Sequence, residues 1–195
     1  GPERVTTVES ELVRATGPVT ITLSGYRNVV RGLIDLAQVD SNGTLQYLNR
    51  ERVHGQGLEG EVGVVRPGGT RVRLAVACQR SDVRETDAEL TNSPRWNAHL
   101  VLTHAPVDRR LSLGLGLRHL SPRLTLGGSR TAAATVADAR LGFRLGHGAK
   151  AGLEVRNLFD ARYGDPGSEE HVGDQIMQDG RALYATLTYR PALRP

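Results

Sequence analysis

Hydrophobic and polar residues alternate with a period of two along most of this chain. In residues 110–118, leucine occupies positions 111, 113, 115 and 117, and small or polar residues occupy the positions between them. The same alternation runs through residues 71–78, 137–145 and 151–156. Because successive side chains of a β-strand point to opposite sides, each segment is predicted to be a strand with one apolar and one polar face.

Five less regular segments complete this pattern. They are residues 3–14, 19–30, 50–65, 95–104 and 180–190. No segment shows the period of an amphipathic helix. The chain is therefore predicted to be all-β, an antiparallel up-and-down meander of about nine strands.

Short and long connections alternate between these predicted strands. Short turns are expected at 16–18, 67–69, 106–108 and 146–148, where glycine and proline gather. Long links are expected at about 31–49, 82–94, 119–131 and 161–179. Outer-membrane barrels have this rhythm because their periplasmic turns are short and their extracellular loops are long.

The alternation also predicts a topology. The last strand follows a long link, so it should run inward from the outer surface, and counting back places residue 1 at the outer rim. Bacterial single-chain barrels have even strand numbers. An odd number that starts at the outer side predicts that residues 1–195 form the carboxyl-terminal portion of a transmembrane β-barrel, with its first strands absent.

Composition narrows the alternatives. The chain has 195 residues, of which 38% are hydrophobic and 24% charged. It contains no apolar run long enough for a membrane-spanning helix. The net charge is +4, but the arginines are spread through the predicted strands, which argues against a nucleic-acid partner. A single cysteine, Cys78, forbids an intrachain disulfide.

Catalytic and metal-binding patterns are weak. Six histidines show no metal-ligand spacing. Ser168, His171 and Asp174 lie within one predicted loop without a nucleophile-elbow motif. The acidic residues of that loop match no calcium-binding pattern and are expected to be solvated; they are Asp165, Glu169, Glu170, Asp174 and Asp179. No enzymatic activity, cofactor or metal site is predicted.

The polar strand faces carry many charged residues. In a barrel these must point to the lumen, because an arginine at the lipid midplane costs about 2–4 kcal/mol. The candidate lumen-facing residues are Arg71, Arg73, Arg110, Arg118, Arg140, Arg144, Glu154 and Arg156. Such a wall would form ion pairs inside the lumen and pass an anionic ligand. The alternative is a solvated sheet face.

The most distinctive passage lies near the carboxyl end. Residues 157–168 contain an Asn-Leu-Phe-Asp element followed by a tyrosine and a glycine- and proline-rich turn, and a Gly-Arg pair opens the last strand. This passage resembles the end of TonB-dependent outer-membrane receptors. The residues that match the family signature are Asn157, Leu158, Phe159, Asp160, Tyr163, Gly164, Gly180 and Arg181. They are expected to be structural, because Asn, Asp and Gly stabilise turns.

Earlier segments resemble the same family in the same order. Residues 3–9 followed by residues 23–28 resemble its hairpin with a Tyr-Arg and Asn element, which is Tyr26-Arg27-Asn28 here, and residues 55–61 resemble its strand with alternating glutamates. Residues 90–97 contain an Asn-Ser-Pro start to a strand, and residues 120–123 a Ser-Pro-Arg segment. The sequence departs from the family in its low aromatic content of 4% and in its ending, which runs past Tyr189 to Pro195.

The resemblance implies a plugged barrel of about 22 strands in the outer membrane of a Gram-negative type cell. The implied function is active uptake of a scarce nutrient of the ferric siderophore or cobalamin class. The implied partners are outer-membrane lipid, the plug domain and remaining strands, TonB through an amino-terminal segment, and a small-molecule ligand. Two alternatives stay open: a stand-alone or soluble antiparallel β binding module derived from such a receptor, and an outer-membrane hydrolase.

Overall fold

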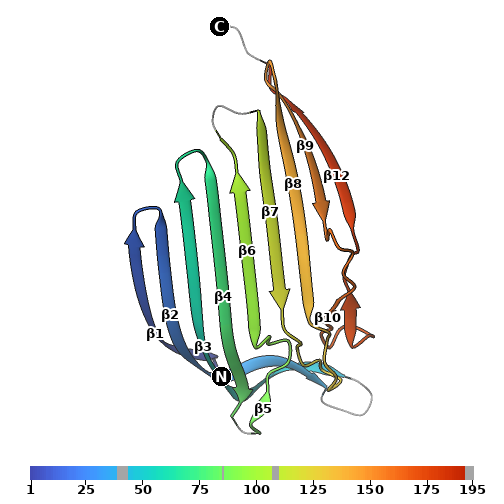
Figure 1. The fold of residues 1–195 in the computed structure, drawn as a ribbon. Helices are drawn as coiled ribbons and strands as arrows, with labels where there is room; N and C mark the ends of the chain where they lie inside the picture. The colour runs from blue at the N-terminus through green and yellow to red at the C-terminus, as the bar shows by residue number, and fades with distance from the viewer. Residues whose placement is uncertain (39–43, 85, 107–109, 192–195) are drawn as a thin grey trace.

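The architecture is one long antiparallel sheet in strand order β1-β2-β3-β4-β6-β7-β8-β9-β12 (Figure 1). The structure is a computed structural model that describes residues 1–38, 44–84, 86–106 and 110–191. The path strands are β1 Arg4–Thr16, β2 Val19–Gln38, β3 Leu45–Arg66, β4 Thr70–Val83, β6 Trp96–His104, β7 Leu111–Leu120, β8 Ala134–Gly146, β9 Ala149–Arg156 and β12 Ala182–Tyr189. Within the described ranges no helix is long and apolar enough to cross a membrane.

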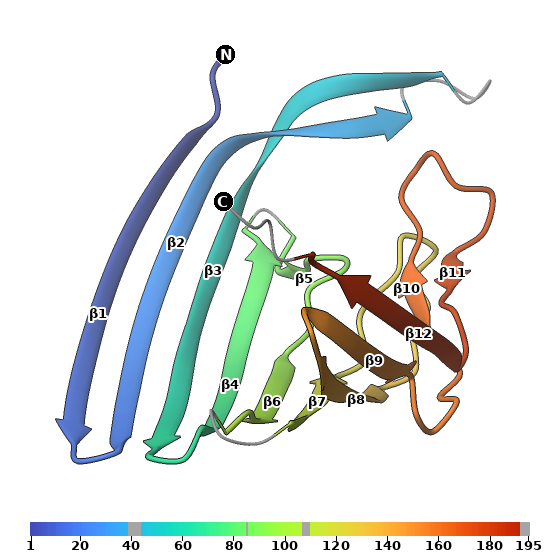
Figure 2. The same ribbon diagram turned by 90° about the horizontal axis from the view of Figure 1, so that it is seen from above.

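The predicted up-and-down meander is confirmed. Every path strand pairs antiparallel with the next path strand along the chain. β5 (Ala88–Glu89) adds a short pairing to β4, and β10 (Gly164–Pro166) pairs with β11 (Gln175–Met177) in a separate two-stranded sheet. Seen from above, the main sheet curves into an open arc (Figure 2).

The short turns gather at one end of the sheet and the long connections at the other (Figure 1). We call these the short-turn end and the long-loop end. The amino terminus lies at the long-loop end, and the last strand, β12, ends at the short-turn end. Both placements match the expected topology, in which the first and last strands run in the same direction.

The predicted long link at 31–49 is wrong in its bounds. β2 continues to Gln38 and β3 begins at Leu45, so most of this segment is paired strand, and residues 39–43 lie outside the described ranges. A β-bulge between Arg31 and Leu33 carries Gly32 at φ +65°. A bulge shifts the following side chains to the other face, so the alternation breaks and the pattern looks like a loop. Beyond it the hairpin bends across the arc (Figure 2).

The other long links also contain regular structure. The link at 82–94 holds β5, and the link at 161–179 holds the β10–β11 hairpin. The link at 119–131 is displaced, because β7 extends to Leu120 and β8 begins at Ala134 rather than at 137. These short pairings carry no period-two pattern long enough to identify from sequence.

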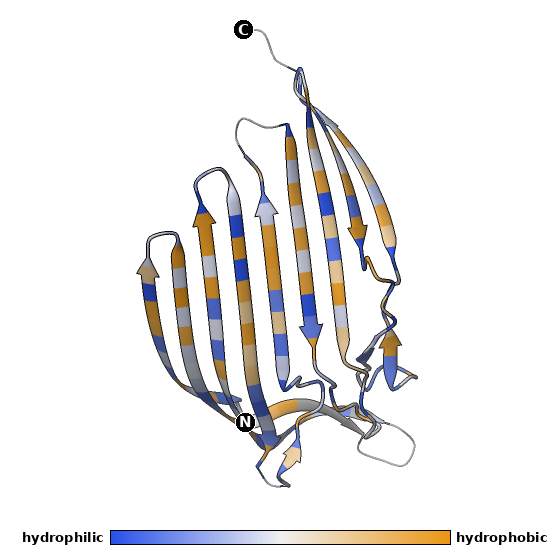
Figure 3. Ribbon diagram, in the orientation of Figure 1, coloured by the Kyte–Doolittle hydropathy of each residue, from blue (hydrophilic) through white to orange (hydrophobic). Residues whose placement is uncertain are grey.

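Apolar and polar residues alternate along the strands (Figure 3). The apolar side is largely exposed: Leu115 is 52% and Leu187 75% accessible. Among the described elements, contacts form only between neighbouring strands, so no second sheet or helix layer covers this side. The few buried apolar residues lie toward the long-loop end; they are Val53, Val83, Ala134, Val136 and Ala137. A β-sandwich is therefore excluded for this part of the chain.

Candidate lumen face and outer loop cluster

The strand register assigns every side chain to one of two faces. Residues paired across an antiparallel ladder point to the same side of the sheet. Leu115 pairs with Leu102 on β6 and with Ala139 on β8. We call the side that carries Leu115 the leucine face, and the opposite side the charged face.

All eight charged residues singled out from the sequence lie on the charged face. One continuous row runs from Arg71 through Thr103, Gly114 and Arg140 to Glu154. The other five follow at even spacing along the same segments; they are Arg73, Arg110, Arg118, Arg144 and Arg156. The face they share is established by the register, and its contact with a lumen stays a prediction.

Ion pairs and aromatic contacts connect several of these residues. Arg73 Nη2 lies 2.6 Å from Glu61 Oε2, and Arg156 Nε lies 2.6 Å from Glu154 Oε1. The Arg156 guanidinium also stacks over the Tyr184 ring, 4.7 Å from its centroid. Because these pairs are solvent-exposed, each contributes little to stability. Both arginines can therefore exchange their present partners for an anion or an acidic surface.

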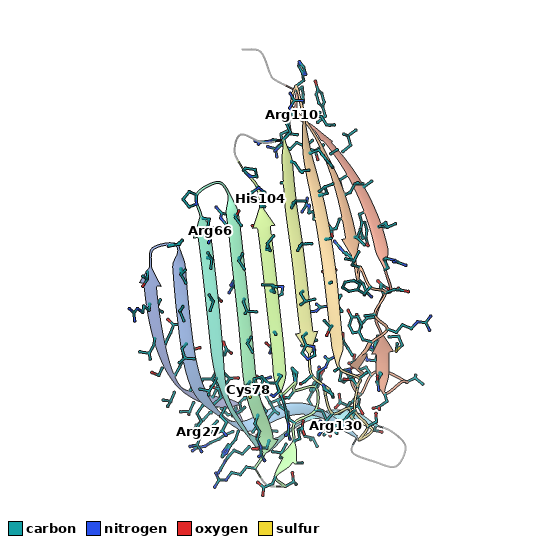
Figure 4. All side chains as sticks on the ribbon, viewed as in Figure 1. Arg27, Arg66, Cys78, His104, Arg110 and Arg130 are labelled. Atoms are coloured by element: carbon teal, nitrogen blue, oxygen red, sulfur yellow. The ribbon has the colours of Figure 1, made fainter. Side chains whose placement is uncertain are left out.

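A hollow of about 590 Å³ opens on the charged face near the short-turn end. Four cations line it: Arg110, Arg140, Arg144 and Lys150. Its floor is low because Gly142 and Gly152 pair with each other, and Ser112, Thr186 and Thr188 add hydroxyls. Figure 4 shows Arg110 at this end of the sheet. Hydroxyls and guanidinium groups around a glycine floor are suited to binding carboxylates or phosphates.

Asn157 forms the corner where β9 turns into the last long connection. It is 4% exposed and adopts φ +49°, a conformation that Asn tolerates better than most residues. Its Nδ2 donates to the carbonyls of Ala161 at 2.9 Å and Asp179 at 3.2 Å, and its Oδ1 accepts from Ala161 N–H at 2.8 Å. Its own N–H donates to Asp138 Oδ1 at 2.8 Å. Asn157 thereby joins both ends of this connection.

Other signature residues extend this corner. Asp160 Oδ1 accepts from the Arg181 N–H at 2.8 Å, and a Cβ at Gly180 would lie 2.7 Å from the same oxygen. Gly164 pairs with Met177 in the β10–β11 hairpin. The remaining three signature residues lie at the edge of this corner. Tyr163 OH accepts a hydrogen bond from Arg118 Nη2 at 3.2 Å, and Leu158 N–H donates to the Ala137 carbonyl at 2.7 Å. Phe159 is 72% exposed.

Sequence reasoning missed the residue that joins the long connections. Arg123 is only 8% exposed. Its guanidinium donates to Asn92 Oδ1 at 3.1 Å and to the Gly164 carbonyl at 3.4 Å, and forms an ion pair with Asp165. Its N–H donates to Thr131 Oγ1 at 3.1 Å. The Ser-Pro-Arg motif signalled this position, but not its partners on two other connections.

Asp174 makes a second link between connections. Thr125 Oγ1 donates to Asp174 Oδ2 at 2.7 Å, Ser129 Oγ donates to the same oxygen, and Gly127 N–H donates to Oδ1 at 2.8 Å. Hydrogen bonds from Ser129, Thr125 and Gly127 lower the pKa of the Asp174 carboxyl. Asp174 is exposed and the Asp165 side chain is 39% exposed, so both carboxylates reach solvent, but each also has partners on another connection that the sequence pattern did not reveal.

A third link joins β5 to its neighbours. Glu89 forms ion pairs with Arg130 at 2.6 Å and with Arg95 at 3.2 Å, and the hydrogen bond from Arg130 is the main reason that the pKa of Glu89 is lowered. We call the linked residues the outer loop cluster; they are Glu89, Asn92, Arg95, Arg123, Thr125, Ser129, Arg130, Asp165 and Asp174.

The loop that contains Ser168, His171 and Asp174 does not form the catalytic triad that the hydrolase alternative requires. Ser168 Oγ lies 2.8 Å from His171 Nδ1, so a serine and a histidine are in contact. The nearby carboxylate of Asp174 instead accepts hydrogen bonds at both oxygens from residues 125–129. A triad needs a third group that orients the histidine. Across the described ranges, no group of three His, Cys, Asp or Glu residues is placed to hold a metal ion.

Comparison with known proteins gives the same architecture. The chain is 25% identical over 172 residues to the vitamin B12 transporter BtuB of Vibrio vulnificus (strain YJ016), covering 88% of this chain and 27% of that protein. The ferric yersiniabactin uptake receptor FyuA from Yersinia pestis superposes with a TM-score of 0.77 at 19% identity, over 95% of this chain and 29% of that chain.

A third protein, the copper transporter OprC, superposes with a TM-score of 0.76 at 19% identity, over 96% of this chain and 31% of that chain. This chain thus spans about three tenths of the length of these proteins. The family model described as "TonB dependent receptor-like, beta-barrel" matches residues 1–158. With more than half of its length matched, the chain belongs to the TonB-dependent receptor β-barrel family.

Proposed function

We propose that residues 1–195 form the carboxyl-terminal portion of the β-barrel of a TonB-dependent receptor, whose plug domain and first strands lie outside this sequence. The family match supports this proposal, as does the share of 27–31% that the chain spans of its relatives. The arc of nine path strands is an open segment of a wall, and closure would require further strands.

The observation that carries the proposal is the single sheet with an uncovered leucine face and a charged opposite face. Exposed apolar surface of this extent is costly in water. In the outer membrane the leucine face would contact lipid, and the eight charged residues would line an aqueous lumen, where arginine avoids its midplane cost. The wall would bind plug and ligand rather than catalyse a reaction.

The transported ligand is proposed to be a scarce nutrient of the ferric siderophore or cobalamin class. The similar proteins are, by their names, a vitamin B12 transporter, a ferric yersiniabactin uptake receptor and a copper transporter. On the charged face, the cationic hollow around Arg140 and Lys150 suits an anionic ligand or an acidic plug surface. Energy would come from TonB through the amino-terminal part of the receptor.

Two adjacent residues of β7 allow a direct test. Leu115 lies on the leucine face and Gly116 on the charged face at the same height of the strand. Each is changed to Cys in the complete receptor, labelled with a nitroxide and reconstituted in lipid. We expect the label at 115 to collide with oxygen dissolved in lipid, and the label at 116 with a water-soluble nickel reagent. Equal exposure of both labels to the nickel reagent would refute the barrel assignment.

Uptake itself needs a cellular test. A strain that lacks the complete receptor should grow poorly when one ferric siderophore or cobalamin is its sole source of that nutrient, and the intact gene should restore growth. Normal growth on every ligand of both classes would refute the proposed substrate class, while leaving the label test of the architecture unaffected.

A further inference from the structure

The leucine face changes character at the long-loop end of β1–β4. One cross-strand row there runs Val8, Arg27, Gln56 and Arg80. The row next to it, toward the short-turn end, runs Ser10, Gly25, Leu58, Cys78 and Trp96. Arginine therefore follows directly after the last apolar row of the face.

More arginines lie beyond that row on the same face. Arg4 pairs with Arg31, and Arg31 pairs with Arg52. We call Arg4, Arg27, Arg31, Arg52 and Arg80 the outer arginine belt.

Among the described residues, two acidic ones lie in or beside these rows on the same face. Asp82 lies 3.2 Å from Arg80 and pairs across the ladder with Glu89. Glu89 is already held by Arg95 and Arg130, which lie outside the belt. Without counting Arg52, the arginines Arg4, Arg27, Arg31 and Arg80 still outnumber Asp82 and Glu89, the acidic residues described beside them, so the belt carries a net positive charge.

The opposite end of the same face is much less basic. On β1–β4 it carries Arg14 and Arg66, each beside a short turn. Figure 4 shows Arg27 at the long-loop end and Arg66 at the short-turn end. The excess of arginine is therefore specific to one end of the membrane-facing surface.

A groove of about 710 Å³ adjoins the belt. Its apolar lining includes Val8, Leu58, Cys78 and Trp96, and Arg27 and Arg80 also line it. Gly25 keeps this space open, because a Cβ there would lie 3.1 Å from Leu58 Cδ2. An apolar groove that ends at two guanidinium groups is suited to a lipid, because the groove can hold an acyl chain and the guanidinium groups can bind its phosphate.

The height of the belt fits the edge of a bilayer. Eight residues separate Val19, beside its short turn, from Arg27, which is roughly 27 Å along the strand. With the usual strand tilt this is about 20 Å across the membrane, close to the apolar band of about 25 Å found in outer-membrane barrels. At that level a charge costs little, and it can meet lipid headgroups.

We propose that the groove and the outer arginine belt bind a phosphate-bearing lipid of the outer leaflet. Its acyl chain lies along Leu58, Cys78 and Trp96, and its phosphates pair with Arg27 and Arg80. Arg4 and Arg31 receive further phosphates. This inference rests on the proposed function, because it takes the leucine face as the lipid-facing one.

The test uses the complete receptor in nonionic detergent, with diphosphoryl lipid A as the probe and native mass spectrometry to count bound lipid. The variant Arg27→Gln/Arg80→Gln should weaken binding about tenfold or more, because each arginine contributes charge-assisted hydrogen bonds. The matched control is Arg14→Gln/Arg66→Gln, which removes the same charge from the other end of the same face. It should bind like the unmodified receptor.

The acyl part has its own pair of variants. Gly25→Val fills the groove and should weaken binding severalfold, whereas Gly60→Val should not. Gly60 lies in the next row of the same face, and a Cβ added there would meet no atom within 4 Å. Dephosphorylated lipid A should bind weakly to every variant.

Three results would overturn the proposal: unchanged binding by Arg27→Gln/Arg80→Gln, equal weakening in the Arg14→Gln/Arg66→Gln control, or equal binding of the dephosphorylated probe. Folding of each variant is checked by its gel mobility with and without heating. The nitroxide at residue 115 separates the two proposals. If that label contacts lipid while the belt variants keep full binding, the belt assignment alone fails.

Discussion

At the residue scale, the side chains of Asn157 and Asp174 both supply hydrogen bonds to segments that lie outside the main sheet ladder. Asn157 satisfies the backbone of Ala161 and Asp179 at the two ends of one connection. Asp174 accepts three hydrogen bonds from residues 125–129 of another connection. Asn157 was identified from sequence because it belongs to the family signature, whereas the partners of Asp174 lie 45 to 49 residues away and no motif pointed to them.

The link made by Asp174 should depend on pH. Its pKa is lowered below the ordinary value of about 3.9, so its contribution is complete above that value and is lost as pH falls through the lower native-state pKa. Hydrogen exchange of Gly127 N–H, corrected for the intrinsic rate, should show less protection in that acidic window. In Asp174→Asn, protection should already be low at neutral pH. Equal protection in both proteins at neutral pH would contradict this role.

At the scale of elements, the long connections are tied together rather than independent. Arg123 lies between β7 and β8, Asn92 lies between β5 and β6, and Asp165 lies in β10. Removal of one partner from a buried charged network leaves the others unpaired, which costs more than the loss of an exposed pair. The cluster should therefore respond very differently to changes at buried and exposed arginines.

Arg123→Met should open the outer loop cluster, and Arg130→Met is its matched control. Arg123 is nearly buried, whereas the Arg130 side chain is 48% exposed in its pair with Glu89. We expect Arg123→Met to cost about 1–3 kcal/mol of local stability and to raise protease cleavage in residues 86–95 and 161–179 severalfold. Arg130→Met should cost much less, because its pair with Glu89 is exposed to solvent. Similar cleavage of both variants would contradict the central place of Arg123.

At the scale of the whole molecule, the two faces should differ in their tolerance of charge. Leu115→Arg places a guanidinium on the leucine face, and Gly116→Arg places one on the charged face, one residue away. The first change should lower barrel stability by about 2–4 kcal/mol, and the second much less. Urea unfolding of the complete receptor in lipid, followed by gel mobility, measures both. A larger loss in Gly116→Arg would reverse the assignment of the faces.

The sequence by itself determined the nine path strands, the common face of the eight charged residues singled out from it, and the separation of short turns from long connections. These properties are local, because a period of two assigns a side chain to a face without knowledge of the neighbouring strand. Positions 111–117 of β7 illustrate this, since their leucines fall on one face as their spacing requires.

Only the tertiary structure decided how distant segments meet. The partners of Arg123 lie 31 and 42 residues away, and the outer arginine belt exists because β1–β4 pair in one particular register. The sequence pattern did not show that β2 continues past Arg31 or that β3 begins at Leu45, because a bulge after Arg31 moves the alternation to the other face. Such features depend on long-range pairing, which a local pattern of side chains does not encode.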